Sequence, residues 1–335
     1  MSSASAGEPV AIGVLAPTST VARLAVIPAI VASPSCRLAA VASRSQPSAE
    51  TPAGARRHAG YEALLADPEV EAVYVPLPNS MHREWTERAA SAGKHVLCEK
   101  PLSVSAEDTS HMSAACAAAG VVLMEAYMTP FHPRSRAIVE LVRSGRLGEL
   151  LFVSTAFTGV LDRPDDHRWR PEMGGGCLLD VGIYCLAPVL ALFSVDSSGV
   201  QELRVGAASA RRTPGGVDST FSGWLDLGAG RSASFQCSFE APERQLFELV
   251  GTEASAVVER AFTPFQDDRT IRLRHRDGSV EVLTTRGDDP YRSMVDHFSD
   301  VVRGRAELDR SPADSIALAG LVERLFAAAG AGACP

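Results

Sequence analysis

The alternation of strand-like and helix-like segments between Val10 and about Ala126 constrains the fold of this chain most strongly. Short apolar runs predict buried strands at Val10–Leu15, Leu38–Ala42, Ala72–Val75, Val96–Leu97 and Val121–Met124. Helical patterns separate them, over Arg23–Ser33, Tyr61–Asp67, Met81–Ala92 and Ala106–Ala119. Strands joined through helices pair in parallel with right-handed crossovers, so we expect a doubly wound parallel sheet of the Rossmann type.

The pattern changes after about Tyr127. A helix over Pro133–Ser144 precedes strand-like runs, several of which alternate apolar and polar residues: Leu150–Thr158, Leu203–Ala210, Ser219–Asp226, Ala233–Phe239, Gln245–Gly251 and Ala256–Glu259. Such alternation is typical of an antiparallel sheet with one covered face. Helices over Tyr291–Arg303 and Pro312–Ala328 follow. We therefore predict an α/β chain with a Rossmann dinucleotide-binding domain at residues 1–127 and an α+β substrate-binding domain at residues 128–335.

Composition excludes several classes of function. With 335 residues the chain can bury two cores, and its net charge of −8 argues against a nucleic-acid partner. The seven cysteines are scattered without metal-ligand spacing, which favours reduced thiols and predicts no metal site. Residues 1–10 lack the pattern of a signal peptide, and no uncharged apolar run reaches membrane-spanning length. A cytoplasmic protein without a membrane partner is expected.

Lys100 follows the apolar run His95-Val96-Leu97 within the sequence Cys-Glu-Lys-Pro-Leu. Pro101 ends any ladder pairing there, so Lys100 lies where the strand runs out. Ligands of open α/β sheets bind just outside the carboxyl ends of the strands. An ammonium group beside Glu99 at that place is either a structural ion pair or a proton donor in a site.

The first strand is followed by a loop that departs from the dinucleotide pattern G-x-G-x-x-G/A. The three glycine positions are occupied by Ala16, Thr18 and Val21. Pro17 in the same loop has no N–H to donate. Hydroxyl groups of Thr18, Ser19 and Thr20 offer a helix cap and polar contacts instead.

The ends of the second and third strands carry further candidates. Ser43 and Arg44 follow the second strand, where an NAD-selective fold places an acidic residue. A hydroxyl and a guanidinium group suit a 2′-phosphate instead, so the sequence favours NADP(H) over NAD(H). Arg44 could instead be a solvated loop residue. After the third strand, Asn79 can cap the helix that carries His82, and His82 could equally lie on a helix face without a role.

The second half of the candidate site is the segment from Arg168 to Tyr184. Three glycines at positions 174–176 predict a tight turn, and the apolar spacing after them suits a helix. Asp180 and Tyr184 are four residues apart, so they share a helix face. A phenol and a carboxylate directed toward Lys100 would form an acid/base set. The alternative is a helix cap with a half-buried tyrosine.

These motifs resemble those of the glucose–fructose oxidoreductase/inositol dehydrogenase (Gfo/Idh/MocA) family. The resemblance lies in the Glu-Lys-Pro motif, the loop from Pro76 to Asn79, Glu125-Ala126-Tyr127-Met128 and the glycine-rich segment that ends at Tyr184. It spans roughly residues 10–330. It is strongest toward the NADP-dependent sugar 3-ketoreductases of deoxysugar biosynthesis. The resemblance implies a Rossmann domain and an open-faced sheet used for homo-dimer or homo-tetramer formation. It also implies hydride transfer between a nicotinamide and a sugar carbon.

The resemblance also implies roles for individual residues. Lys100 would polarise the reacting oxygen, Tyr184 would donate the proton, and Asp180 would be the accompanying carboxylate. Cofactor contacts are expected from the phosphate loop, the strand ends and the segment near residue 170: Ala16, Thr18, Ser19, Thr20, Ser43, Arg44, Leu77, Pro78, Asn79, His82, Glu99, Lys100, Trp169 and Arg170. Arg163, Asp166 and His167 could touch the sugar.

The resulting functional prediction is NADPH-dependent reduction of a keto-sugar, specifically a nucleotide-linked one. One alternative is an NAD(P)-dependent sugar or aminocyclitol dehydrogenase, because the sequence does not encode the direction of the reaction. Another is a non-catalytic binding protein whose phosphate loop has decayed.

Overall fold

The structure, a computed structural model, describes residues 8–43, 54–195, 203–263 and 266–330. The chain divides into two compact units. Unit 1 contains residues 1–103, 107–128 and 291–316, and unit 2 contains residues 104–106, 129–290 and 317–335.

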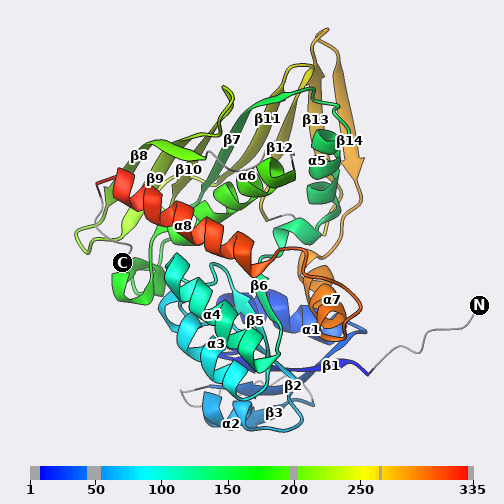
Figure 1. The fold of residues 1–335 in the computed structure, drawn as a ribbon, viewed down its shortest axis with the longest axis vertical. Coiled ribbons are helices and arrows are strands. Elements are labelled where there is room, and N and C mark those ends of the chain that lie inside the picture. The colour runs from blue at the N-terminus through cyan, green and yellow to red at the C-terminus, as the bar shows by residue number, and fades with distance from the viewer. Residues whose placement is uncertain (1–7, 44–53, 196–202, 264–265, 331–335) are drawn as a thin grey trace, which may run out of the picture. The chain divides into compact units, whose positions relative to one another are not determined.

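Unit 1 is built on a parallel sheet of six strands in the order β3-β2-β1-β4-β5-β6 (Figure 1). Its strands are β1 (Val10–Leu15), β2 (Cys36–Ala42), β3 (Arg56–His58), β4 (Ala72–Val75), β5 (His95–Glu99) and β6 (Leu123–Ala126). Its helices are α1 (Ile27–Ala32), α2 (Tyr61–Leu65), α3 (His82–Ser91), α4 (Ala106–Ala119) and α7 (Pro290–Val302). All pairings between neighbouring strands are parallel, which confirms the predicted Rossmann type.

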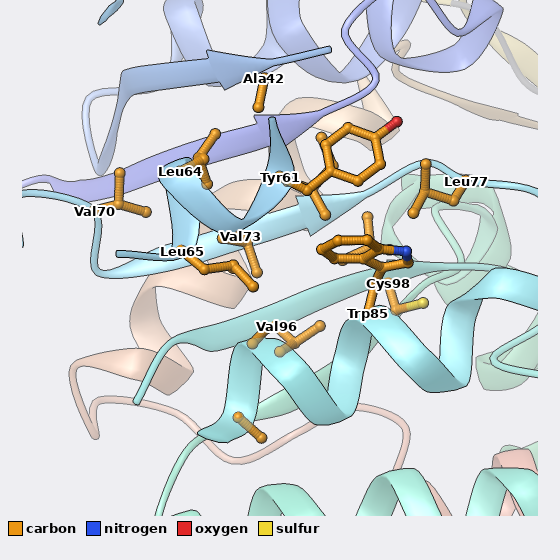
Figure 2. Close-up of a cluster of buried hydrophobic side chains, with 14 of the residues drawn as sticks. Ala42, Tyr61, Leu64, Leu65, Val70, Val73, Leu77, Trp85, Val96 and Cys98 are labelled. Carbon is orange, nitrogen blue, oxygen red and sulfur yellow. The ribbon is translucent and has the colours of Figure 1, made fainter. Parts of the chain in front are cut away.

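One face of this sheet forms a continuous apolar core with α2, α3 and α4. Figure 2 shows Tyr61 and Trp85 meeting there, with ring centroids 4.8 Å apart and an interplanar angle of 88°. Edge-to-face aromatic pairs of this kind contribute about 0.5–1.5 kcal/mol beyond the area they bury. The glycine inside β1 belongs to the same packing, because a Cβ on Gly13 would lie 2.7 Å from the side chain of Leu64.

Helix α7 belongs to unit 1, although it follows unit 2 in the sequence. Asp296 of α7 accepts a 2.5 Å hydrogen bond from the Ser33 hydroxyl, and the Ser299 hydroxyl donates to the carbonyl of Ser35. These contacts tie α7 to the connection between α1 and β2. Residues 291–316 thus cluster with unit 1, whereas the sequence predicts two consecutive domains, because the amphipathic pattern of a helix does not indicate which unit it joins.

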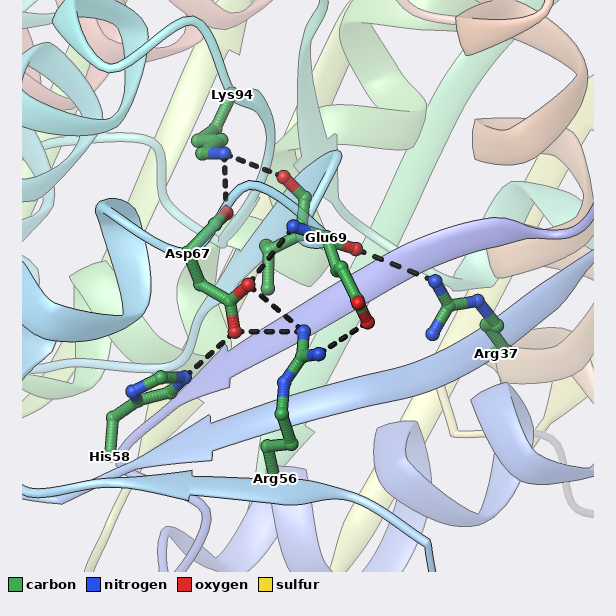
Figure 3. A network of polar contacts seen from close by, with 7 residues as sticks. Arg37, Arg56, His58, Asp67, Glu69 and Lys94 are labelled. Carbon is green, nitrogen blue, oxygen red and sulfur yellow. Dashed lines mark hydrogen bonds and ion pairs between the residues drawn. The ribbon is translucent and has the colours of Figure 1, made fainter.

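A polar network fixes the loop between α2 and β4 (Figure 3). The carboxylate of Asp67 accepts hydrogen bonds from Arg56 and His58, and Arg56 also pairs with Glu69. Lys94 is buried and donates from Nζ to the carbonyls of Asp67 and Val70, at 2.8 and 2.7 Å. The sequence contains one other lysine, Lys100. Lys94 is thus a structural residue of this loop.

Unit 2 contains an eight-stranded sheet in the order β14-β13-β12-β11-β7-β10-β9-β8. Its strands are β7 (Leu150–Thr158), β8 (Arg204–Arg212), β9 (Asp218–Asp226), β10 (Ser232–Ser238), β11 (Arg244–Gly251), β12 (Ala254–Glu259), β13 (Arg269–His275) and β14 (Val280–Thr285). Among the described strands of this sheet, β7 and β10 pair in parallel and the other neighbours pair antiparallel, so the predicted mostly antiparallel sheet is confirmed.

Helices cover one face of this sheet. They are α5 (Pro133–Arg143), α6 (Ile183–Val195) and the part of α8 (Pro312–Ala328) that belongs to unit 2. Phe326 of α8 packs edge-on against Phe221 of β9, with centroids 5.7 Å apart. Residues 171–193 form one helical stretch that is long and apolar enough to cross a membrane by composition, but 67% of its most apolar window is buried inside the protein. Burial of that extent is typical of a core helix.

Candidate active site

Lys100 follows the last residue of β5 and is held by hydrogen bonds to its neighbours. The preceding residue, Glu99, is buried and accepts a 2.5 Å hydrogen bond from the hydroxyl of Tyr74 on β4. The other carboxylate oxygen of Glu99 accepts from the backbone N–H of Lys100, at 3.2 Å. Burial and the Glu99 carboxylate together raise the pKa of Tyr74, so its phenol stays protonated and keeps donating. The predicted place of Lys100 at the carboxyl edge of the sheet is confirmed.

Glu125 fixes the other side of the lysine. This buried carboxylate of β6 accepts from the backbone N–H of Leu102 at 3.2 Å and from the Ser315 hydroxyl at 2.6 Å. The guanidinium of Arg310 lies 3.5 Å away and forms an ion pair with it. A buried carboxylate with this many partners is rigid, so the main chain around Lys100 is anchored two residues beyond it.

His82 is fully buried at the start of α3. Its Nδ1 lies 2.9 Å from the carbonyl oxygen of Pro101, and its Nε2 lies 2.8 Å from the carbonyl oxygen of Leu77. Burial lowers the pKa of this histidine. Both ring nitrogens therefore face main-chain atoms of unit 1, which leaves no edge of the ring exposed for the cofactor contact that the sequence predicts.

The phosphate loop contains no glycine, but its backbone still adopts a conformation that glycine usually provides. Ala16 has a φ of +46°, the left-handed conformation that glycine adopts without strain. The Ser19 hydroxyl accepts from the N–H of Ala22 at 3.3 Å, so the predicted hydroxyl cap is present. The N–H groups of Thr18 and Thr20 have no acceptor among the described residues, and both residues are exposed. Unpaired N–H groups at a helix start are the usual binding site of a phosphate, and this loop fits a dinucleotide.

The other predicted cofactor residues lie at different depths. Ser43 is half-buried directly after β2, and Arg44 lies outside the described residues. Leu77 belongs to the apolar core, while Pro78 and Asn79 are partly exposed. The N-cap residue of α3 is Met81, which makes no side-chain hydrogen bond there, and Asn79 lies in the short helical turn Asn79–Met81 before it, so its capping role stays a prediction.

In unit 2 the glycine run makes the start of the predicted helix possible. A Cβ on Gly175 would lie 2.5 Å from the carbonyl oxygen of Arg168, and one on Gly176 would lie 2.1 Å from Oδ1 of Asp218. Asp218 is buried and accepts from the N–H of Leu178 at 2.7 Å and from the thiol of Cys177 at 3.2 Å. It therefore caps the helix start from a distant strand.

Asp180 and Tyr184 lie near the start of this helix. Residues 178–182 form a π-helical turn before α6 begins, and such turns are frequent at functional sites. Asp180 accepts a 2.7 Å ion-pair hydrogen bond from Arg168, which also pairs with Asp166, and both carboxylates raise the pKa of Arg168.

The phenol ring of Tyr184 packs among aromatic side chains. Phe157 meets it edge-on with ring centroids 5.4 Å apart, and Phe262 lies 6.3 Å away. Trp169 packs edge-on against Phe239 with ring centroids 5.3 Å apart, and Arg170 is exposed. Lys100 belongs to unit 1, whereas Tyr184 and Asp180 belong to unit 2, so their joint action stays a prediction.

Sequence reasoning missed several residues that shape these two groups. Tyr74, Arg168 and Asp218 were not among the candidates, because each acts through a partner that is distant in sequence or across a turn. Of the three, Arg168 was the easiest to predict from the sequence. It directly precedes the candidate Trp169, and the candidate carboxylate Asp180 needs a cation as its partner.

The comparisons with known proteins agree with this arrangement. Residues 19–127 match the model of an oxidoreductase family with an NAD-binding Rossmann fold, and residues 135–257 match the GFO/IDH/MocA C-terminal domain. A dTDP-3,4-didehydro-2,6-dideoxy-alpha-D-glucose 3-reductase of Streptomyces violaceoruber is 38% identical over 283 residues, which cover 83% of this chain and 81% of that protein. A D-xylose 1-dehydrogenase (NADP(+)) of Haloferax volcanii is 35% identical over 315 residues, which cover 92% and 94%.

A solved structure supports the same relationship. The 3-ketoreductase of Actinomadura kijaniata, in complex with NADP and TDP-benzene, superimposes with a TM-score of 0.89 at 28% identity, covering 96% of this chain and 98% of that one. Solved forms of that enzyme include variants of one tyrosine and of one lysine. The identity to curated relatives over most of the length, together with the two matched domains, shows that this chain belongs to the Gfo/Idh/MocA family of oxidoreductases.

Proposed function

We propose that this oxidoreductase uses NADPH to reduce the 3-keto group of a nucleotide-linked deoxysugar. The anchored Lys100 segment is the single observation that carries the proposal. Glu99 and Leu102, on either side of the lysine, are held by hydrogen bonds to buried groups of neighbouring strands. A polarising group needs such a fixed position to stabilise charge that develops on a carbonyl oxygen. The similarity to dTDP-sugar 3-reductases supports the substrate class.

Different residues of unit 1 would bind different parts of the cofactor. The N–H groups of Thr18 and Thr20 would hold the pyrophosphate, and Ser43 with Arg44 would hold the 2′-phosphate. Leu77, Pro78 and Asn79 would border the nicotinamide end. The bound cofactor supplies a hydride to the carbonyl carbon.

The protein's own groups would then complete the reduction. The Lys100 ammonium binds the carbonyl oxygen and stabilises the alkoxide that forms on it. Tyr184 gives its phenolic proton to that oxygen, and the phenolate recovers a proton from solvent. Asp180, held by Arg168, orients the substrate hydroxyl next to the reacting carbon. One hydride and one proton thus convert the ketone to an alcohol.

The experiment is a turnover assay that follows NADPH oxidation with a dTDP-linked 3-keto-2,6-dideoxysugar. We expect wild-type turnover, and a loss of about 10²–10⁴-fold in kcat for Lys100→Ala and for Tyr184→Phe. Tyr61→Phe in the core of unit 1 is the matched control and keeps normal kcat. The double variant tests joint action: losses that simply multiply would contradict a single acid pair. No turnover of the dTDP-linked substrate by the wild type would refute the proposed substrate.

A second candidate is the oxidising direction, an NADP⁺-dependent sugar dehydrogenase. The similarity to the D-xylose 1-dehydrogenase of Haloferax volcanii favours it. Incubation of the protein with NADP⁺ and D-xylose separates the two candidates, because only a dehydrogenase of free sugars produces NADPH there. A protein that binds neither NADPH nor NADP⁺ would instead be the non-catalytic alternative.

We also propose that the chain forms a homo-dimer or homo-tetramer through the sheet of unit 2, in the cytoplasm. Large apolar side chains on these strands are exposed, including Phe152 at 48%, Trp224 at 45% and Val282 at 55%. Large apolar side chains that stay in water lose the favourable free energy of burial, and contact with a second copy of the chain would recover it. Sedimentation velocity tests the proposal: Phe152→Arg should dissociate the oligomer, and a monomeric wild type would refute it.

A further inference from the structure

His82 joins two segments of unit 1 that the proposed function places on the cofactor and on the substrate. One is the loop after β4, which contains Leu77, and the other is the segment after β5, which carries Lys100. The ring lies between the carbonyl oxygens of Leu77 and Pro101, at 2.8 and 2.9 Å. The histidine itself is the first residue of α3, so a rigid helix holds the bridge.

The bridge is strong because it is buried. The exposed fraction of His82 is 0%, and a hydrogen bond lost there leaves a carbonyl oxygen without water to replace the donor. A neutral imidazole donates to one of the two carbonyls, and an imidazolium donates to both. Burial lowers the pKa of His82 and so favours the neutral ring, while the neighbouring main-chain groups and the carboxylate of Glu125 act in the opposite direction.

Pro101 is the residue next to Lys100. Its carbonyl group is fixed by His82, and the following N–H is fixed by Glu125. A shift of the ring would therefore move the peptide unit beside the lysine. A displacement of about 1 Å of a catalytic group can cost about 10²-fold in rate.

We propose that His82 is a positioning residue that sets the geometry of Lys100 relative to the cofactor loop after β4. It acts through the main chain and touches neither substrate nor cofactor. The inference rests on the proposed function for the roles of Lys100 and of the loop, but the bridge itself is a property of the cofactor-free chain.

Because the chain contains two lysines, NMR spectroscopy can observe the Lys100 side chain directly. Lys94 and Lys100 are its two lysines, so protein labelled with ¹³C-lysine gives two side-chain Cε signals. Lys94 is the internal reference, because its Nζ donates to the carbonyls of Asp67 and Val70 and to neither partner of His82. The test compares wild type, His82→Phe, which keeps a ring but no N–H, and His82→Gln, which keeps an amide donor. His111→Phe, at an exposed histidine of α4, is the control.

We expect the Lys100 signal of His82→Phe to shift and broaden while the Lys94 signal stays in place. His82→Gln should fall between His82→Phe and the wild type, and His111→Phe should match the wild type. The Kd for NADPH, measured by nicotinamide fluorescence, should rise at least about fivefold in His82→Phe and less in His82→Gln.

An unchanged Lys100 signal in folded His82→Phe overturns the proposal. Should that variant fail to fold, His82→Gln decides by the same criterion. The spectra are recorded without cofactor or substrate, so their outcome is independent of the proposed reaction. A wild type that binds no NADPH would remove the reductase proposal and leave the result on the bridge intact.

Discussion

Replacing Asp218 by alanine should destabilise unit 2 at the start of the helix that carries Asp180 and Tyr184. The carboxylate caps this helix from β9, accepting from the N–H of Leu178 at 2.7 Å and from the thiol of Cys177 at 3.2 Å. Alanine leaves the buried N–H without an acceptor, which costs about 1–3 kcal/mol. Loss of a negative charge at a helix N-terminus adds about 0.3–1 kcal/mol. The free energy of unfolding should fall by about 1.3–4 kcal/mol.

Asparagine at the same position should cost much less. Its amide oxygen still accepts from the N–H of Leu178, and the neutral group avoids the penalty of a buried charge. Burial raises the pKa of Asp218, so the folded protein binds this proton more tightly than the unfolded chain does. The contribution of Asp218 to stability therefore falls as the pH rises from about 3.8 through the folded pKa, and Asp218→Asn lacks this dependence.

The assay is denaturation by urea, followed by circular dichroism at several pH values. Asp162→Ala, at an exposed aspartate of the loop after β7, is the control and should change the free energy of unfolding by less than about 0.5 kcal/mol. A loss below about 1 kcal/mol for Asp218→Ala would refute the capping argument. An equal loss for asparagine and alanine would refute the assignment of the effect to the unpaired N–H.

Three further substitutions test other contacts. Gly176→Ala should lower the free energy of unfolding, measured in urea, by more than about 2 kcal/mol. The reason is that φ of Gly176 is +121° and the new Cβ would lie 2.1 Å from Oδ1 of Asp218. A urea midpoint equal to that of the wild type would contradict this. Lys94→Met keeps the buried stem but removes two hydrogen bonds to carbonyls, so we expect a loss of about 2–3 kcal/mol by the same measurement, and a loss near zero would count against it. The hydrogen bond from Arg303 lowers the pKa of Glu71, so this carboxylate stabilises the fold above its unfolded pKa of about 4.3, and the stability is lost as the pH falls through the folded value. Glu71→Gln should therefore lower the thermal midpoint more at pH 7 than at pH 3, and an equal difference at both pH values would contradict the pairing.

The sequence predicts the framework of the fold well where strands are apolar runs bounded by turns. The strand Ala72–Val75 and the helix Ala106–Ala119 have the predicted bounds. The strands β3, β13 and β14 were not predicted, because Arg56–His58 is short and polar, and Arg269–His275 alternates arginines with its two buried residues, Ile271 and Leu273. Alternation of that kind is a strand signal, but the frequent charges mask it.

The candidate site shows where sequence reasoning ends. The position of Lys100 follows from local order, since a proline after an apolar strand defines the strand end. The burial of His82 between two carbonyls depends on two loops that meet only in the folded unit, so a contact with the cofactor was predicted in error. The positive φ of Ala16 was equally hidden, because a residue letter does not report the conformation that its surroundings impose.

The central claim is that the phosphate loop binds the cofactor although it contains no glycine. Titration of the purified protein with NADPH and with NADH, followed by nicotinamide fluorescence, tests it most directly. We expect saturable binding of NADPH at micromolar concentrations and at least about tenfold weaker binding of NADH. Ser43 and Arg44 suit a 2′-phosphate, and they occupy the place after the second strand where an acidic residue would hold a free ribose hydroxyl. Equal affinity for the two cofactors, or no binding of NADPH at millimolar concentration, would contradict it.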